Sequence, residues 1–146
     1  MAFNELIHNK CLIVPISIWA IIQLWKFIWD SIKTRKINFR RLLGAGGMPS
    51  SHSAVVTSLM ITVGSYKGWG SPEFALAVMF ACIVMYDAAG VRRAAGKQAR
   101  ILNQIVNTKE MSELEVREKL VEVLGHTPFE VFIGALIGVV YALIII

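Results

Sequence analysis

Four apolar segments divide this chain, and their length constrains its fold more than any other feature. They span residues 12–29, 53–66, 74–89 and 129–146. A helix needs roughly 17–25 apolar residues to cross a hydrocarbon core of about 30 Å. The first, third and fourth segments approach or reach that length, and the second does so if its helix begins near Pro49. The sequence therefore predicts an all-α integral membrane protein of about four transmembrane helices.

Composition favours a membrane protein over a soluble helical bundle, which is the alternative fold. The hydrophobic fraction is 55% and the mean hydropathy is +0.59, whereas charged residues make up 17%. The first apolar segment lacks a small-residue cleavage pattern, and Lys33, Arg35 and Lys36 follow it. This flank is typical of a stop-transfer segment rather than of a secretory signal. We expect one multi-pass domain over residues 1–146, located in the cell membrane.

The net charge of +5 is unevenly distributed. The segment between the first and second helices carries five Lys or Arg residues, the one between the third and fourth carries seven, and the remaining connection has only Lys67. By the positive-inside rule both basic segments are cytoplasmic and both termini lie outside. Between Ser112 and Gly125, a capping-box pattern and one apolar face predict a short cytoplasmic amphipathic helix.

Polar groups beside the second and fourth helices fall on the cytoplasmic side. Ser50, Ser51 and His52 open the second helix behind a glycine-rich loop. The free N–H groups and positive dipole end of that helix form an anion site. His126 precedes the fourth helix, and Glu130, four residues later, shares its helical face within reach of the ring.

Cations accompany these groups. Arg92 and Arg93 follow the third helix, and Asp87, about one turn earlier, is placed to orient one of them. The two arginines point about 100° apart on a helix, and the sequence does not choose between them. Cys11 and Cys82 show neither metal-ligand spacing nor a disulfide framework, so no metal site is expected.

Several of these motifs resemble the type 2 phosphatidic acid phosphatase superfamily, which includes the vanadium-dependent haloperoxidases, and most of all its small divergent bacterial and plant branch. Residues 49–52, PSSH, are similar to the superfamily's Pro-Ser-Gly-His motif. His126 and Glu130 keep the His-to-carboxylate spacing of another motif, with Glu for Asp. Lys33 and Arg40 have the spacing of a third, Lys-x6-Arg-Pro, although arginine replaces its proline.

The chain also departs from the superfamily pattern. The expected Ser-Arg pair is missing, because Lys119 and Leu120 stand at its positions, and residues 90–99 are the expected substitute. Four helices are fewer than the superfamily's usual six. Either the pocket is shallower, or a second subunit completes it, which would make the protein a homodimer.

The resemblance implies a phosphatase-like domain that hydrolyses a lipid phosphate or isoprenyl diphosphate without a metal or cofactor. His126 would attack phosphorus to form a phosphohistidine, Glu130 would fix its tautomer, and His52 would protonate the leaving oxygen and then activate water. The groups implied in phosphate binding are Lys33, Arg40, Arg92 or Arg93, and the N–H groups near Ser50 and Ser51.

Two other functions fit parts of the same pattern. One is a catalytically inactive membrane protein that binds anionic lipid headgroups, or scaffolds a partner, through the same basic pocket. The other is a small transporter or channel component in which Asp87 and the histidines carry protons. These residues gather at one membrane boundary rather than at mid-membrane, which disfavours a proton path. No nucleic-acid partner is expected.

Overall fold

The computed structural model describes residues 2–39, 47–106 and 125–146, and its regular elements in these ranges are all α-helices. They are α1 (Ala2–Ile7), α2 (Lys10–Thr34), α3 (Ser51–Lys67), α4 (Pro72–Ala89), α5 (Val91–Val106) and α6 (Pro128–Ile145). The prediction of an all-α integral membrane protein is confirmed. Arg40 and the predicted amphipathic helix after Ser112 lie outside the described residues.

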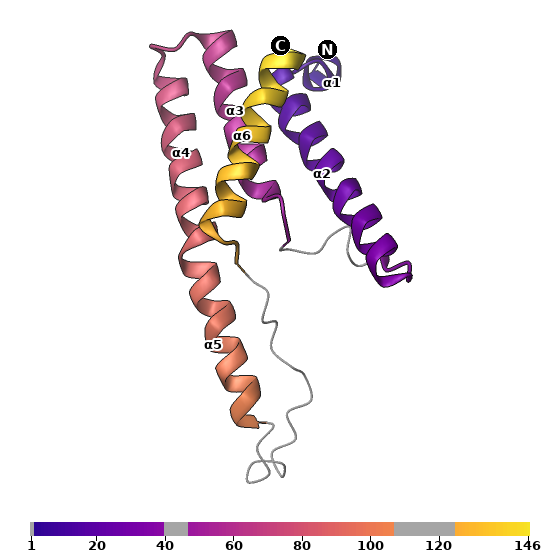
Figure 1. The fold of residues 1–146 in the computed structure, drawn as a ribbon. Coiled ribbons are helices and arrows are strands. Elements are labelled where there is room, and N and C mark those ends of the chain that lie inside the picture. Colours follow the sequence, from indigo (N-terminus) through magenta and orange to yellow (C-terminus); the bar gives the residue numbers. More distant parts are fainter. Residues whose placement is uncertain (1, 40–46, 107–124) are drawn as a thin grey trace.

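Three stretches of helix are long and apolar enough to cross a membrane within the described ranges: α2, Pro72–Ile105 and α6. The second joins α4 and α5, because the N–H of Gly90 donates to the carbonyl of Tyr86 and Ala94 donates to Gly90. The remaining predicted span is α3, which corresponds to the second apolar segment. It has 17 residues and lies between α2, α4 and α6 (Figure 1). Its inner face is rich in Ser and Thr, which lowers its hydropathy, so the count of four spans stays a prediction.

Local sequence signals explain where the helices begin. Asn9, Ser50, Ser71 and Thr127 are the N-cap residues of α2, α3, α4 and α6. Each side chain accepts a hydrogen bond from an N–H group of the first turn, which would otherwise lack a partner. Pro72 and Pro128 follow two of these caps, where a proline has no N–H to lose.

The contact between α3 and α6 uses small residues. Gly134 and Gly138 are buried on α6, and a Cβ atom on either would collide with backbone atoms of Ser50 or Ala54. The hydroxyl of Thr57 donates to the carbonyl of Ala135 across this contact, at 3.0 Å. Lipid tails remove most of the hydrophobic drive for helix association, so close packing and interhelical hydrogen bonds hold such helices together. This contact fixes where the start of α6 lies relative to the start of α3.

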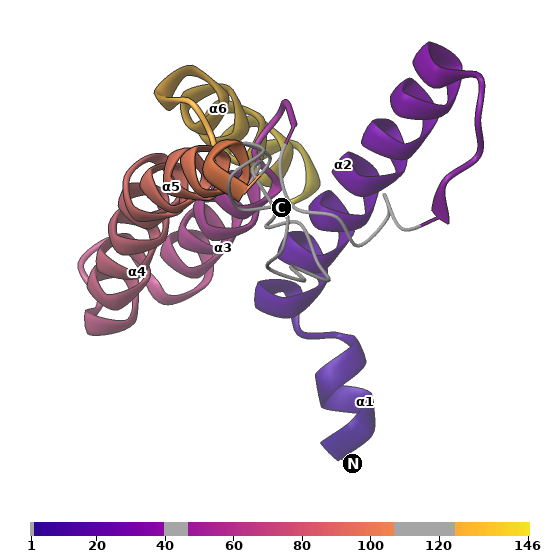
Figure 2. The same cartoon turned by 90° about the horizontal axis from the view of Figure 1, so that it is seen from below.

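Helix α2 packs against the bundle only as far as Lys26, its last buried residue. Ile18 and Ile22 are buried against Ala54 of α3, and the hydroxyls of Ser17 and Tyr141 lie 2.8 Å apart between α2 and α6. Farther along, α2 diverges from the other helices, as the view from below shows (Figure 2).

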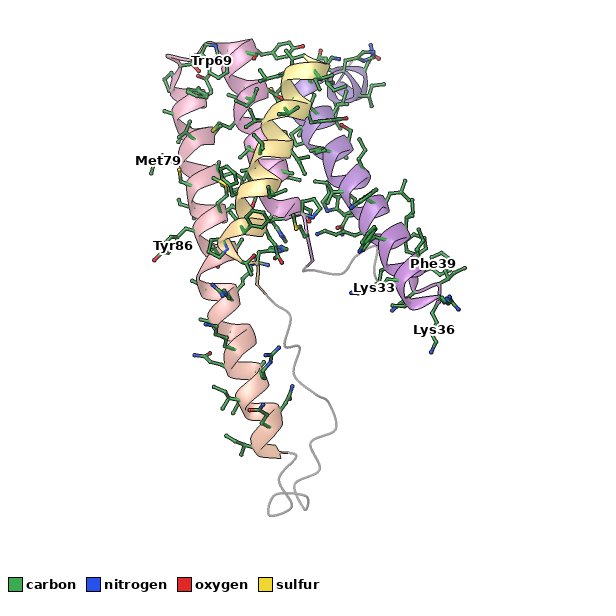
Figure 3. The ribbon with its side chains drawn as sticks, in the orientation of Figure 1. Lys33, Lys36, Phe39, Trp69, Met79 and Tyr86 are labelled. Carbon is green, nitrogen blue, oxygen red and sulfur yellow. The ribbon has the colours of Figure 1, made fainter. Side chains whose placement is uncertain are left out.

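The two ends of the bundle differ in charge. The α3–α4 turn, with Trp69, and both termini lie at one end, and the last turn of α2, with Lys33 and the following Lys36, lies toward the other (Figures 1 and 3). This up-and-down arrangement places the described parts of the two basic segments, at the end of α2 and the start of α5, away from the end that holds the termini. Which side is cytoplasmic remains the prediction drawn from the loop charges.

Gly138→Ala tests the α3–α6 contact. The added methyl group collides with Ala54 and Thr57, so we expect it to lower the stability of the bundle by about 1–3 kcal/mol. Thermal unfolding in detergent, followed by tryptophan fluorescence, should show a Tm lower by several degrees. Gly70→Ala is the matched control, because a Cβ atom at that turn meets nothing within 4 Å. Equal losses in both variants would contradict this role.

The orientation can be tested in intact cells with a membrane-impermeant thiol reagent. In a background lacking Cys11 and Cys82, we expect Lys67→Cys to be labelled, because Lys67 is exposed at the end predicted to face outward. Lys36→Cys, exposed at the opposite end, should be labelled only after the membrane is permeabilised. The reverse pattern would invert the topology.

Candidate active site

Two histidines, one on α3 and one just before α6, lie close together at the end of the bundle opposite the termini. His52 lies in the first turn of α3, and His126 lies just before α6. Their ring centroids are 6.4 Å apart, with the ring planes inclined at 60°. His126 is only 3% exposed, whereas His52 is half-buried. Both rings can therefore reach a single bound group between them.

The ring of His126 is held by the first turn of α6. Its Nδ1 lies 2.9 Å from the carboxylate Oε2 of Glu130. The same oxygen accepts the N–H of Thr127, whose hydroxyl accepts the N–H of Glu130 in return, which completes a capping box. With Nδ1–H donating to the carboxylate, Nε2 keeps its lone pair and is the nitrogen free for chemistry.

The backbone at the start of α6 is anchored to its neighbours. The N–H of His126 donates to the carbonyl of Ala88 at the end of α4, at 3.0 Å. Gly125 lies so close to Arg92 and Arg93 that a Cβ atom there would overlap their backbone. Residues 90–99, the expected substitute for the missing Ser-Arg pair, thus begin beside His126.

The two predicted serines differ in what they offer a ligand. Ser50 is fully buried, its hydroxyl accepts hydrogen bonds from Ser53, and its N–H donates to the carbonyl of Glu130. Ser50 is therefore engaged in joining α3 to α6. The N–H groups of Ser51 and His52 make no hydrogen bond within the part of the chain that the structure describes. These are the amides that α3 presents to an anion.

A pocket of about 450 Å³ opens beside His52. Its polar end is formed by His52, Asp87 and Arg92, and the Nε of Arg92 is 2.6 Å from Oδ2 of Asp87. The rest of its lining is apolar: Trp19, Val55, Val56, Phe80, Ile83 and Val84. Arg92 thus lines the pocket with Asp87 beside it, and Arg93 is not among the lining residues.

One histidine atom in this site lacks a partner. Nδ1 of His52 is shielded from solvent and has no hydrogen-bond partner among the described residues. An unsatisfied buried polar atom carries a free-energy cost, so such atoms call for an explanation in a native structure. A ligand that accepts a hydrogen bond from this nitrogen, or donates one to it, would remove that cost.

Lys33 of the predicted lysine motif is not brought to the histidines. Lys33 is exposed near the end of α2 that diverges from the bundle (Figure 3), and Arg40 lies outside the described residues. Two other residues of α2 are buried instead: Lys26 is 4% exposed and Gln23 is 5% exposed. The sequence contained a signal for them, because they are the main polar interruptions of an apolar run, and ionisable groups inside a membrane usually mark a functional site.

Comparison with known proteins identifies the family of this chain. The sequence profile of the Divergent PAP2 family matches residues 7–141. The uncharacterized membrane protein YuiD of Bacillus subtilis (strain 168) is 38% identical over 152 residues, which covers 97% of this chain and 96% of that protein. No solved structure matches significantly. The location in a membrane is thereby confirmed, as is the resemblance carried by the motifs around His52 and His126: the chain belongs to the divergent PAP2 family.

Proposed function

We propose that this protein is a metal-independent phosphohydrolase that acts on a lipid phosphate at the cytoplasmic boundary of the membrane. Membership of the divergent PAP2 family relates the chain to membrane phosphatases. The observation that carries the finer proposal is the pair of histidines 6.4 Å apart, one of them held by a carboxylate. A nucleophile oriented by a third group, with an acid–base residue nearby, is the arrangement that covalent catalysis requires.

The proposed reaction has two displacement steps. Nε2 of His126 attacks phosphorus, the bond from phosphorus to the ester oxygen breaks, and His52 gives a proton to that oxygen as it leaves. His52 then takes a proton from water, the resulting hydroxide attacks the phosphohistidine, and the nitrogen–phosphorus bond breaks to release phosphate. Glu130 stabilises the positive charge that develops on His126 during the first step.

Charge on the phosphoryl oxygens needs donors in fixed positions. Arg92 lies at the polar end of the pocket beside His52, and the N–H groups of Ser51 and His52 supply the positive end of the α3 dipole. Asp87 holds the guanidinium of Arg92 through its Nε, which leaves the terminal nitrogens for a ligand.

The pocket also supports a lipid as the substrate. Its polar end lies beside His52, and the apolar side chains of α2, α3 and α4 form the remaining wall. A molecule with an anionic head and a hydrocarbon tail would match both parts. Lipid monophosphates and isoprenyl diphosphates both fit this description.

Phosphate release by the detergent-purified protein tests the proposal. With long-chain lipid mono- and diphosphates in EDTA, we expect turnover by the wild type and a loss of about 10³-fold or more in His126→Ala. His8→Ala is the matched control, since His8 lies beside α1, remote from the pocket, and should leave turnover unchanged. Activity that disappears in EDTA or survives in His126→Ala would contradict the mechanism. Orthovanadate binding without turnover on any lipid would favour the inactive headgroup-binding protein.

The proposed mechanism also predicts that turnover in this assay depends on pH with a bell-shaped profile. His126 must be neutral to attack phosphorus, whereas His52 must be protonated to assist the leaving oxygen, so only part of the pH range holds both states. A profile that stays flat from about pH 5 to 9 would show that the two histidines do not act as nucleophile and acid.

A further inference from the structure

A buried lysine on α2 lies outside every motif described above. Lys26 is 4% exposed although its neighbours Leu24 and Trp25 are each 54% exposed, so this turn of α2 directs its charged residue inward and these two apolar residues outward. Removing an ammonium group from water costs several kcal/mol unless nearby groups compensate. Within a membrane protein, such a residue faces the interior of the bundle and commonly serves a ligand or a proton.

The spacing along α2 shows which way Lys26 faces. Trp19, Gln23 and Lys26 follow each other at intervals of four and three residues, which places them on one side of the helix. Trp19 lines the pocket that contains His52 and Arg92. Gln23 and Lys26 continue this stripe, one and two turns nearer to the end of the bundle where the histidines lie.

A neighbouring stripe of α2 is apolar and lines a different cavity. Ile18, Ile22 and Trp25 line a groove of about 560 Å³ that α2 forms with α6. The two stripes of α2 therefore border different spaces: one lines the groove, and the other contributes Trp19 to the pocket beside His52.

Electrostatics gives a second, independent link between Lys26 and the site. Lys26 is among the charged groups close enough to His52 to act on it, together with Arg92, His126 and Asp87. Asp87 is the one carboxylate of this set, and it is already paired with Arg92. A phosphoryl group carrying two negative charges would meet Arg92 from the α4–α5 side and Lys26 from the α2 side, with His52 between them.

We propose that Lys26 is a phosphate-binding residue of the site, so that α2 supplies the cation that the sequence motif assigned to Lys33. This inference rests on the proposed function for its substrate. Lys33 lies seven residues farther along α2, about 10 Å beyond Lys26, on the part of the helix that leaves the bundle. The phosphate is then bound deeper in the bundle than Lys33 would allow, next to the apolar wall that receives the lipid tail.

Lys26→Met and Lys33→Met separate the two assignments. Binding of inorganic phosphate and of orthovanadate is measured by calorimetry in detergent, and kcat/KM is measured with a long-chain lipid phosphate. A charge-assisted hydrogen bond contributes about 1.5–3 kcal/mol, so we expect Lys26→Met to weaken anion binding about 10- to 100-fold. Lys26→Arg, which keeps the charge, should restore part of the loss. Lys36→Met, which removes an exposed charge from the same helix end, is the control.

The outcomes are distinguishable from those that test hydrolysis. Loss of anion binding in Lys26→Met without turnover by the wild type would support Lys26 and reject the phosphatase. Turnover and binding that depend on Lys33 and not on Lys26 would overturn the inference and leave the phosphatase intact. Replacing a buried charge by an apolar residue is often neutral for folding, and a matched Tm would exclude a structural loss. If the Met variant does not fold, Lys26→Gln gives the same comparison.

Discussion

The close approach of α3 and α6 is the constraint on which the rest of this structure depends. Gly134 and Gly138 leave no room for a side chain against Ser50 and Ala54, and no other residue type would let the two backbones come this near. The histidines lie at the ends of these same helices, His52 on α3 and His126 before α6. A shift of one helix along the other would therefore change the distance between the two rings, and with it the site.

Several residues of the site also cap the N-terminal ends of helices. Glu130 completes the capping box of α6 and holds the ring of His126, and Ser50 caps α3 while donating its N–H to the carbonyl of Glu130. Such sharing ties the orientation of the ring to the start of the helix. It also explains why these polar residues gather at one end of the bundle, since a helix terminus is where backbone N–H groups need partners.

Sequence analysis reached the four apolar helices and the two histidines beside them, because each is encoded locally. The apolar runs predict these helices, although α3 begins at Ser51 rather than near Pro49, and the interval from His126 to Glu130 brings the two side chains into contact. It did not reach Lys26, which interrupts the first apolar run. The motif spacing pointed to Lys33 instead, and spacing along one helix carries no information about where that helix diverges from its neighbours.

What the sequence determined by itself is the membrane class, the family and the pairing of His126 with Glu130, since hydropathy, motif order and a four-residue interval across the start of one helix need no partner helix. Only the tertiary structure decided which cations line the pocket and which are buried. Arg92 rather than Arg93 lines the pocket, and Lys26 rather than Lys33 is the buried lysine of α2. The physical reason is that helix rotation and divergence are set by packing between helices, here by small residues on α3 and α6 and by the packing of α2 as far as Lys26.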